Sequence, residues 1–245
     1  MNIKDASVLV TGGNRGFGQS LVQELLAAGA RKVYVGTRTL TATSDARIRQ
    51  LKLDITHERD IAAAVEACQD VTILINNAGV LYMHPLLEAP RDSVRAEMET
   101  NYVGVLRVVQ AFAPVLKNNG GGMIVNILSH LSWFALPTLA TYSASKAAAM
   151  LLTDGLRMEL RSQGTQVVGV YTGFMNTDMV AQIHSPKVSA EVVAANTIQG
   201  ILAGQDEILA DPGTPDGSPG SQYIQAALSQ DRQGFYQNVQ HWTGQ

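Results

Sequence analysis

The sequence has little that would tie it to a metal, a disulfide partner or a membrane. It holds a single cysteine, Cys68, so it cannot form an internal disulfide or a cysteine-based metal site. Its histidines form no spaced ligand pair with one another or with the cysteine, so we expect no metal site. No run approaches the roughly eighteen apolar residues of a membrane-spanning helix, and the first residues show no signal-peptide pattern. We therefore expect a cytoplasmic globular protein.

Charge is also scarce. Charged residues make up 16% of the 245 residues, and hydrophobic residues make up 46%. Such a charged fraction, below the roughly one quarter of an ordinary globular chain, argues against disorder. The formal net charge is −3, from 18 basic and 21 acidic residues, with no block of like charges. A nucleic-acid or membrane-surface partner needs a concentrated positive patch, so we expect neither.

Short apolar runs alternate with longer helical stretches along the chain. Most of the runs are continuously apolar, which is typical of strands buried on both faces of a parallel sheet. We predict strands at 7–11, 32–36, 48–53, 71–75, 123–127, 166–170 and 207–210. We predict helices at 16–28, 58–67, 93–116, 141–161 and 190–202. This order predicts an α/β fold of the doubly wound Rossmann type, with a mostly parallel sheet and helices on both faces.

The chain shows no repeat and no mid-chain linker, so we predict one domain over residues 1–245. The segment 39–47 is too short for a full crossover helix, and we expect one or two turns there at most. Residues 211–221 are rich in proline, glycine and serine and predict a loop. The C-terminal extension 222–245 is polar, and its aromatic residues would pack on a partner subunit, pack over a pocket, or belong to a loosely docked end, which is the favoured interpretation. These aromatic residues are Phe235, Tyr236 and Trp242.

A glycine-rich turn follows the first predicted strand and opens the first predicted helix. After Thr11 it contains Gly12, Asn14, Arg15, Gly16, Phe17 and Gly18. Glycine permits a tight strand-to-helix turn, a close approach of the backbone to a pyrophosphate, and close packing of the helix on the strand. The helix N-terminus then stabilises phosphate charge through its free N–H groups and its dipole. The turn therefore predicts a dinucleotide site.

The end of the second predicted strand indicates which dinucleotide binds. An acidic residue at this place would bind a ribose hydroxyl, and a basic residue accommodates a 2′-phosphate. Here the strand runs into Thr37 and Arg38, with no carboxylate. Arg38, aided by Arg15, would pair with the phosphate through charge-assisted hydrogen bonds. We therefore predict NADP(H), and the alternative is that Arg38 is a solvated loop residue.

A tyrosine and a lysine lie four residues apart at the start of a predicted helix. Tyr142 and Lys146 share one helix face, close enough to influence each other. A phenol with a pKa of about 10 is a poor acid or base at neutral pH, and a nearby ammonium moves the pKa toward a useful range. Ser129 lies just beyond a buried strand, at the edge where ligands gather in such sheets, so its hydroxyl is placed to hold a substrate carbonyl. Taken alone, a Tyr-x-x-x-Lys pair is usually a pair of surface residues without a catalytic role.

These motifs together resemble, in order and spacing, the short-chain dehydrogenase/reductase family. The resemblance rests on the glycine turn, the run Asn76–Gly79, Ser129 and the Tyr142/Lys146 pair, and it covers about residues 7–179. It implies that Tyr142 is the general acid in carbonyl reduction, or the base in the reverse direction. It also implies that Lys146 lowers the pKa of Tyr142 and binds the nicotinamide ribose, and that Ser129 orients the carbonyl.

The resemblance implies further site residues. Asn101 is similar to the family's asparagine that holds a proton-relay water, and Asp54 to the aspartate that hydrogen-bonds the adenine. Thr177 would bind the nicotinamide amide. Beyond the glycine turn and the Tyr142/Lys146 pair, the expected cofactor contacts are Thr37, Arg38, Asp54, Ile55, Asn77, Ala78, Gly79, Gly173 and Thr177.

The sequence departs from the family's pattern near the expected substrate. The family commonly has Pro-Gly where this chain has Thr172 and Gly173, which restores a backbone N–H and frees φ beneath the nicotinamide. The substrate-covering segment between Thr177 and Ser189 is short, so we expect an open pocket. His130, next to the predicted catalytic serine, is either a substrate contact or a residue that simply occupies the loop.

The leading hypothesis is NADPH-dependent reduction of a ketone or aldehyde, reversible as alcohol oxidation. Aromatic and methionine residues near the expected substrate mouth, Phe174 among them, favour an apolar or aryl carbonyl over a charged sugar or acid. The alternative is a catalytically silent NADP-binding regulatory or scaffold protein, which would be expected to lose catalytic residues that this chain keeps. Epimerisation or dehydration is a third interpretation, but such relatives usually carry a larger C-terminal substrate domain. Surplus apolar residues on helices 93–116 and 141–161, together with the resemblance, predict a homodimer or homotetramer.

Overall fold

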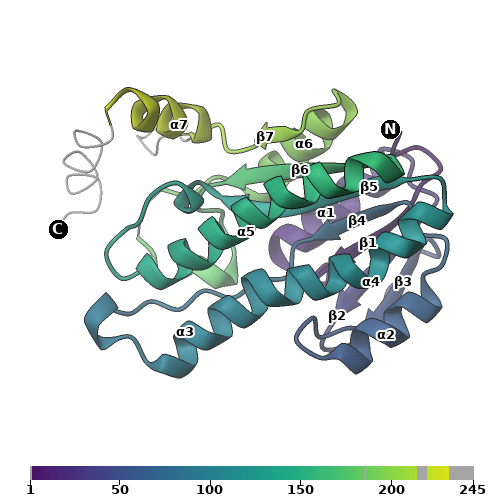
Figure 1. Cartoon of the computed structure of the whole chain (residues 1–245), viewed down its shortest axis with the longest axis horizontal. Helices are drawn as coiled ribbons and strands as arrows, with labels where there is room; N and C mark the ends of the chain where they lie inside the picture. The colour runs from purple at the N-terminus through teal and green to yellow at the C-terminus, as the bar shows by residue number, and fades with distance from the viewer. Residues whose placement is uncertain (1, 185, 214–219, 232–245) are drawn as a thin grey trace.

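A computed structural model describes residues 2–184, 186–213 and 220–231 (Figure 1). In this part of the chain one sheet has the strand order β3-β2-β1-β4-β5-β6-β7, and every pair of neighbours is parallel. The strands are β1 (Ser7–Thr11), β2 (Lys32–Thr37), β3 (Ile48–Lys52), β4 (Ile73–Asn76), β5 (Gly122–Ser129), β6 (Thr165–Thr172) and β7 (Glu207–Leu209). The order reverses at β1, which lies between β2 and β4. In such sheets the ligand site lies outside the carboxyl ends of the strands at this reversal.

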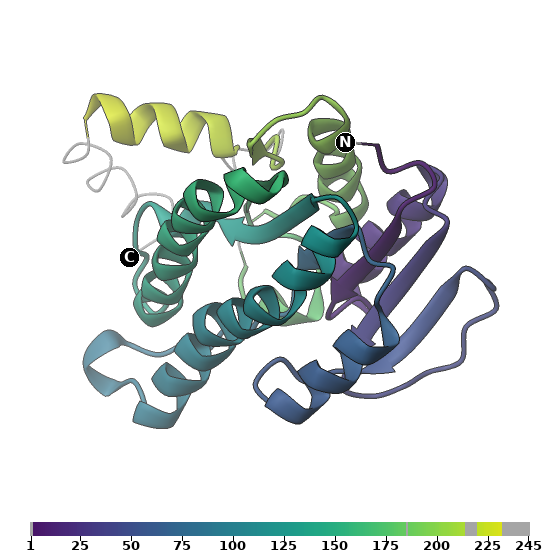
Figure 2. The same cartoon turned by 45° about the vertical axis from the view of Figure 1, so that its right-hand side comes forward.

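Helices cover both faces of the sheet (Figure 2). They are α1 (Gly16–Ala27), α2 (Glu58–Ala67), α3 (Arg91–Met98), α4 (Val105–Asn118), α5 (Ala140–Glu159), α6 (Ala190–Leu202) and α7 (Ser221–Gln230). One apolar core lies between the sheet and the pair α1 and α6, and a second lies between the sheet and α2, α4 and α5. Strands β1, β4 and β5 are buried throughout because both of their faces are covered. The predicted doubly wound α/β fold is confirmed.

The helices differ from the prediction in two places. The helix predicted at 93–116 is divided, because a π-helical turn (Glu99–Gly104) separates α3 from α4. Residues 39–47 form no helix, which agrees with the expectation of one or two turns at most. Residues 221–230, predicted as the end of a loop and a polar tail, form α7, whose Ile224 is 1% exposed. The predicted aromatic tail, with Phe235, Tyr236 and Trp242, lies outside the described residues.

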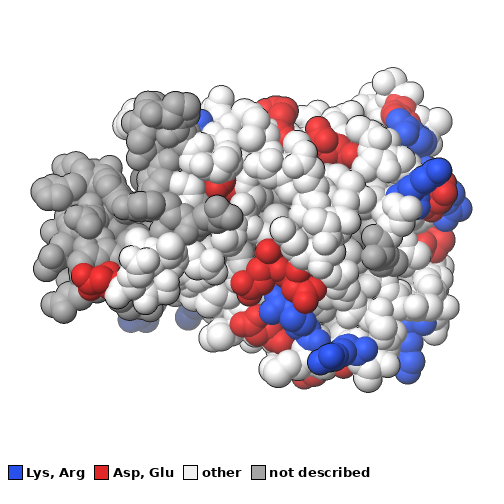
Figure 3. Space-filling view, turned by 90° about the horizontal axis from the view of Figure 1, so that it is seen from above, with Lys and Arg blue, Asp and Glu red and all other residues white. Residues whose placement is uncertain are grey.

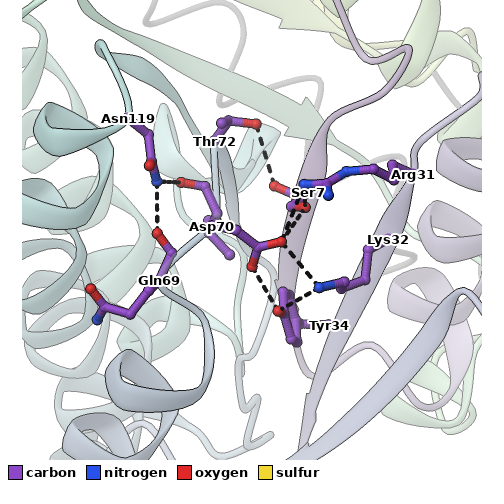
Figure 4. Close-up of polar contacts among 9 residues, drawn as sticks. Ser7, Arg31, Lys32, Tyr34, Gln69, Asp70, Thr72 and Asn119 are labelled. Atoms are coloured by element: carbon purple, nitrogen blue, oxygen red, sulfur yellow. Dashed lines mark hydrogen bonds and ion pairs between the residues drawn. The ribbon is translucent and has the colours of Figure 1, made fainter.

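A polar cluster at the amino edge of the sheet holds the beginnings of β1, β2 and β4 together (Figure 4). The Asp70 carboxylate accepts hydrogen bonds from the Ser7 hydroxyl at 2.8 Å and the Tyr34 hydroxyl at 2.7 Å. It also pairs with Lys32 at 3.1 Å and Arg31 at 3.2 Å. The cluster sets the relative placement of the three strands whose opposite ends carry the glycine turn, Arg38 and the run Asn76–Gly79.

Replacing Asp70 with asparagine should lower the free energy of unfolding at neutral pH by about 1 kcal/mol, since the partners lose a charged acceptor that is partly solvated. Burial alone would raise the pKa of Asp70, but the hydrogen bonds from Tyr34, Ser7 and Lys32 outweigh it and lower the pKa to about 2. The stabilisation is therefore present above about pH 4 and is lost as the pH falls toward 2.

Urea denaturation at about pH 7 and about pH 3 tests this, because the difference between wild type and D70N should shrink in acid. Asp92→Asn is the matched control, since Asp92 is 97% exposed and its ion pair with Arg95, at 3.7 Å, lies at the surface. A difference that does not depend on pH would contradict the explanation by charge.

Acidic and basic side chains are mixed in small groups on the face seen in Figure 3, with broad uncharged surface between them. Among the described residues, no helix combines the length and the apolar character needed to cross a membrane. The described residues also contain no group of three or more histidine, cysteine, aspartate or glutamate side chains placed to share a metal ion.

Candidate active site

Two adjoining hollows form one groove along the carboxyl edge of the sheet. They share Ala78 and Gly79, in the loop after β4. The predicted residues in the first hollow are Gly12, Asn14, Arg15, Gly16, Phe17, Gly18, Asn77, Ala78, Gly79, Tyr142, Lys146 and Thr177. Those in the second hollow are Arg38, Asp54 and Ile55, again with Ala78 and Gly79. The predicted residues that line neither hollow are Thr37, Asn101, Ser129, His130, Gly173 and Phe174.

The glycine turn has the geometry that its sequence requires. Gly12 and Gly16 have φ values of +66° and +52°, in the left-handed region that favours glycine. At Gly18 a Cβ atom would lie 2.3 Å from the Gly12 carbonyl oxygen and 2.5 Å from the Asn77 amide nitrogen. Only glycine therefore lets α1 begin this close to the loops after β1 and β4.

Hydrogen bonds between those two loops fix the shape of the turn. The Thr11 hydroxyl accepts the backbone N–H groups of Asn77 and Ala78, both at 3.0 Å. The side-chain amide of Asn77 donates to the carbonyls of Thr11 at 2.9 Å and Gly12 at 3.1 Å. The predicted cofactor residue Asn77 thus lines the groove and also holds the glycine turn in place.

The N-terminus of α1 is free to meet an anion. Its N-cap residue, Arg15, makes no side-chain capping hydrogen bond, so no side chain caps the first N–H groups of the helix. Arg15 pairs with Asp178 at 3.5 Å, and both side chains are mostly exposed. A Cβ atom on Gly16 would lie 3.4 Å from the Thr177 methyl group, so Thr177 is next to this helix end. The structure therefore brings together the phosphate end of the predicted site and the predicted nicotinamide contact.

Arg38 and Asp54 both line the second hollow. Arg38 is exposed, and Asp54 accepts hydrogen bonds from the Thr56 N–H at 3.0 Å and the Thr56 hydroxyl at 2.7 Å. Burial would raise the pKa of Asp54, but Thr56 and the nearby His57 and Arg38 outweigh it, so the pKa is lowered. Thr37 is buried, and its hydroxyl bonds the main chain two residues on, so it shapes the loop that carries Arg38.

The first turns of α5 place Tyr142 and Lys146 at the inner end of the first hollow. They are 9% and 7% exposed, and the Lys146 Nζ lies 5.9 Å from the centre of the Tyr142 ring. The same Nζ donates to the Ile127 carbonyl at 2.8 Å, at the end of β5. Burial lowers the pKa of Lys146 to about 8. Ser129, two residues beyond Ile127, is 5% exposed.

Burial is the largest influence on the acid–base behaviour of Tyr142. It raises the pKa of the phenol well above its usual value, hydrogen bonding with Ser129 lowers it, and the charge of Glu97 raises it. The sequence predicted Lys146 as the main influence, and the structure differs because the ring is enclosed by apolar side chains. A neutral phenol is the form that can give a proton.

Asn101 lies in the π-helical turn between α3 and α4 and is 1% exposed. Its side-chain oxygen accepts the Val80 N–H at 2.9 Å, and its amide donates to the Val80 carbonyl and the Ser145 hydroxyl, both at 2.9 Å. The Ser145 hydroxyl in turn donates to the Tyr142 carbonyl at 2.7 Å. Asn101 therefore connects the loop after β4 to the helix turn that carries Tyr142. Single π-helical turns are frequent at functional sites.

Thr172, which replaces the proline common in the family, continues β6 to its end. It pairs with Ser129 across the sheet, and its hydroxyl donates to a main-chain carbonyl of β5 at 3.2 Å. At Gly173 a Cβ atom would lie 1.7 Å from an oxygen of Asp211 and 3.0 Å from the His130 ring. Glycine at this position therefore makes room for Asp211, a buried carboxyl whose pKa is raised by burial.

His130 is enclosed by aromatic side chains beside Ser129. Its ring centre lies 5.8 Å from that of Phe134 and 5.7 Å from that of Phe174. Burial lowers the pKa of His130 to about 4, so the ring is neutral at physiological pH. Its Nδ1 atom is buried and has no hydrogen-bond partner among the described residues.

The expected open pocket stays a prediction, although Tyr142 itself is buried. The helix α7 packs against the turn His130–Ser132, and its Ile224 belongs to the same apolar cluster as Tyr142. Tyr142 belongs to an apolar cluster that contains Leu131, Phe134, Leu139, Val180, Ile183 and Ile224. Sequence reasoning missed Ile224 because α7 is polar overall, and it missed Asp211 and Glu97 because no motif surrounds them.

The comparisons with known proteins agree with this geometry. The family model described as short chain dehydrogenase matches residues 6–187. A crystal structure of a short chain dehydrogenase from Burkholderia cenocepacia J2315 in complex with NADP is 38% identical, with a TM-score of 0.89, and the match covers 98% of this chain and 99% of that one. Gluconate 5-dehydrogenase of Gluconobacter oxydans is 34% identical over 74% of this chain and 76% of its own length. The chain belongs to the short-chain dehydrogenase/reductase family of oxidoreductases.

Proposed function

We propose that this protein reduces an apolar or aryl ketone or aldehyde with NADPH and oxidises the corresponding alcohol in reverse. The observation that carries the proposal is the position of Tyr142 and Lys146, buried side by side at the inner end of a groove whose other wall is the glycine turn. The complex of the Burkholderia protein with NADP supports the choice of cofactor.

The groove fits a dinucleotide. Glycines with positive φ let the backbone come close to a pyrophosphate, and the uncapped N-terminus of α1 offers N–H groups to its charge. Arg38 and Asp54 would hold the adenosine end, with Arg38 pairing with a 2′-phosphate. Lys146 would hold the nicotinamide ribose, and Thr177 the nicotinamide amide.

The chain contributes positioning and proton transfer. When bound, NADPH supplies the hydride that reaches the carbonyl carbon. The Ser129 hydroxyl would orient the carbonyl oxygen, and Tyr142 would give that oxygen its phenolic proton as the C–O π electrons move onto it. Lys146 would stabilise the phenolate that remains, and Asn101 would hold a water through which the proton is replaced. In alcohol oxidation the same groups act in reverse, with Tyr142 as the base.

The surroundings of the reacting centre support an apolar substrate. Tyr142 belongs to the same apolar cluster as Leu131, Phe134 and Ile224, and Phe174 packs against this cluster. We propose His130 and Phe174 as substrate contacts, because they adjoin each other beside Ser129.

The two alternative functions considered in the sequence analysis remain alternatives to this proposal. A regulatory NADP-binding protein would need no enclosed Tyr142 and Lys146. Epimerisation or dehydration would call for a second substrate domain.

The proposal is tested by fluorescence titration with NADPH and NADH, followed by NADPH oxidation with a panel of aryl, aliphatic and cyclic ketones. Tight NADPH binding with turnover of apolar ketones is the expected result. Tight binding with no turnover of any ketone would favour the regulatory alternative.

Replacing Arg38 with aspartate should reverse the cofactor preference. Loss of a charge-assisted contact to the 2′-phosphate should weaken the binding of NADPH about 10- to 100-fold. The new carboxylate should strengthen the binding of NADH by accepting a hydrogen bond from the ribose hydroxyl. Fluorescence titration measures both affinities. Arg161→Asp is the matched control, because Arg161 is exposed and lies in neither hollow. An unchanged ratio of the two affinities would show that Arg38 does not read the phosphate.

The predicted homodimer or homotetramer also stays a prediction. Leu151 and Met158, on the outer face of α5, are 67% and 75% exposed, which supports an interface there. The cytoplasmic location stays a prediction as well.

A further inference from the structure

An ion pair joins the two sides of the groove in which the cofactor is proposed to bind. Arg15, the N-cap residue of α1, lies 3.5 Å from the carboxylate of Asp178, in the segment after β6. Both residues line the first hollow, and their side chains are 68% and 84% exposed. Among the described residues that line this hollow, Asp178 is the one acid, against the bases Arg15 and Lys146. An acid here needs a reason, because the proposed ligand is a polyanion.

The segment that carries Asp178 is anchored on both sides. Asp178 begins a one-turn 3₁₀-helix that ends at Val180, and Val180 is buried in the apolar cluster around Tyr142. Before this turn, the Asn176 N–H donates to the Val188 carbonyl at 2.9 Å. The backbone of Asp178 is therefore held at the rim of the first hollow, and a change of partner has to come from the arginine.

Arg15 lies close to the proposed contact for the 2′-phosphate. The glycine turn that carries it touches the end of β2, because the Gly12 N–H donates to the Gly36 carbonyl at 2.8 Å. Arg38, two residues beyond Gly36, lines the second hollow, which adjoins the first. The Arg15 side chain is long and mostly exposed, so other rotamers can carry it from Asp178 toward Arg38 with little loss of packing.

The ion pair is weak enough for a phosphate to replace it. A pair of exposed side chains contributes little, because water and salt screen the charges and both side chains lose freedom. A phosphate monoester carries close to two negative charges at neutral pH, and arginine binds it through parallel charge-assisted hydrogen bonds. The 2′-phosphate would therefore take Arg15 from Asp178. The carboxylate would then be left unpaired in the same groove as the pyrophosphate, where like charges repel.

We propose that Asp178 competes with the 2′-phosphate of NADPH for Arg15, and thereby limits how tightly the enzyme holds this cofactor. The inference rests on the proposed function. Binding of NADPH requires Arg15 to leave Asp178, and release is assisted because Asp178 takes Arg15 back. NADH has no 2′-phosphate, so the competition lowers the affinity for NADPH more than the affinity for NADH. Asp178 is thus a residue that sets cofactor affinity and takes no part in the chemical step.

The test measures the Kd of NADPH and of NADH by fluorescence titration at low ionic strength, without substrate. The proteins are the wild type, Asp178→Asn, Arg15→Gln and the double variant. Asparagine keeps the size and polarity of the aspartate side chain and removes its charge. The matched control is Asp92→Asn, because Asp92 also forms an exposed ion pair with an arginine and lines neither hollow. Stopped-flow displacement gives the dissociation rates.

Asp178→Asn should bind NADPH about three- to tenfold more tightly, through slower dissociation, and NADH less than about twofold more tightly. In the Arg15→Gln background the same substitution should change both affinities by one small factor, because there is no arginine to release. The gain for NADPH should shrink at about 0.5 M salt, since exposed charges are screened. Asp92→Asn should leave both affinities unchanged.

Weaker NADPH binding by Asp178→Asn would overturn the inference, because the ion pair would then be a clasp that retains the cofactor. An unchanged Kd would also overturn it, and so would an equal gain for NADPH and NADH, which would mean that Asp178 acts on the cofactor without Arg15. If the gain for NADPH appears but the wild type reduces no ketone, the proposed reductase activity fails and the competition for Arg15 stands. If the wild type binds neither dinucleotide, both are wrong.

Discussion

Replacing Tyr142 with phenylalanine should abolish ketone reduction while leaving NADPH binding unchanged. Removing a positioned general acid costs about 10²- to 10⁴-fold in turnover, and no other described side chain near the carbonyl site is placed to take over. Ser129 has a far higher pKa than a phenol, and Lys146 is engaged with the Ile127 carbonyl. The ring itself stays in the apolar cluster, so the wall of the site keeps its shape.

NADPH affinity should stay within about twofold of wild type, because the groups proposed to hold the dinucleotide belong to the glycine turn, Arg38 and Lys146. Single-turnover kinetics and fluorescence titration separate the two effects. Tyr34→Phe is the control: it removes a phenol bonded to Asp70 at the opposite edge of the sheet, so it should affect stability and not turnover. Retained turnover in Tyr142→Phe would defeat the mechanism, and equal loss in both variants would indicate a folding defect.

The sheet was predictable because its strands leave a plain signal in the sequence. Strands buried on both faces must be apolar throughout, so β1 and β5 appear as continuous runs with little ambiguity. The π-helical turn at Glu99–Gly104 leaves no comparable signal, since one extra residue in a helix barely changes its apolar periodicity. The helix α7 was missed for a similar reason: Ile224 is a single buried residue in a polar segment.

The candidate site also contains some residues that could be predicted from the sequence and others that could not. The turn Gly12–Gly18 and the pair Tyr142/Lys146 could be found because their chemistry requires particular residue types at fixed spacing. Glu97 and Asp211 could not, since their importance comes from burial and from neighbours distant in sequence. The same limit applies to the pKa of Tyr142, where the i and i+4 spacing suggested control by lysine and the tertiary enclosure makes burial dominant.

Replacing Gly18 with alanine should strongly disturb the cofactor site. The added carbon would lie 2.3 Å from the Gly12 carbonyl oxygen and 2.5 Å from the Asn77 amide nitrogen. Neither atom can withdraw freely, because the Asn77 amide is bonded to the carbonyls of Thr11 and Gly12. The helix α1 must therefore move away from the loop after β4. This movement widens the glycine turn and shifts the N–H groups of the turn away from the expected position of the pyrophosphate.

We expect Gly18→Ala to lower the free energy of unfolding by about 1–3 kcal/mol, as overpacking does. We also expect it to weaken the binding of NADPH at least about tenfold. Urea denaturation measures the first effect and fluorescence titration the second. The matched control is Gly155→Ala in α5, where a Cβ atom would meet nothing within 4 Å. That variant should gain about 0.5–1 kcal/mol from helix propensity and bind NADPH normally. Normal NADPH binding by Gly18→Ala would mean that the turn does not cradle the pyrophosphate, and the site would have to be sought elsewhere along the groove.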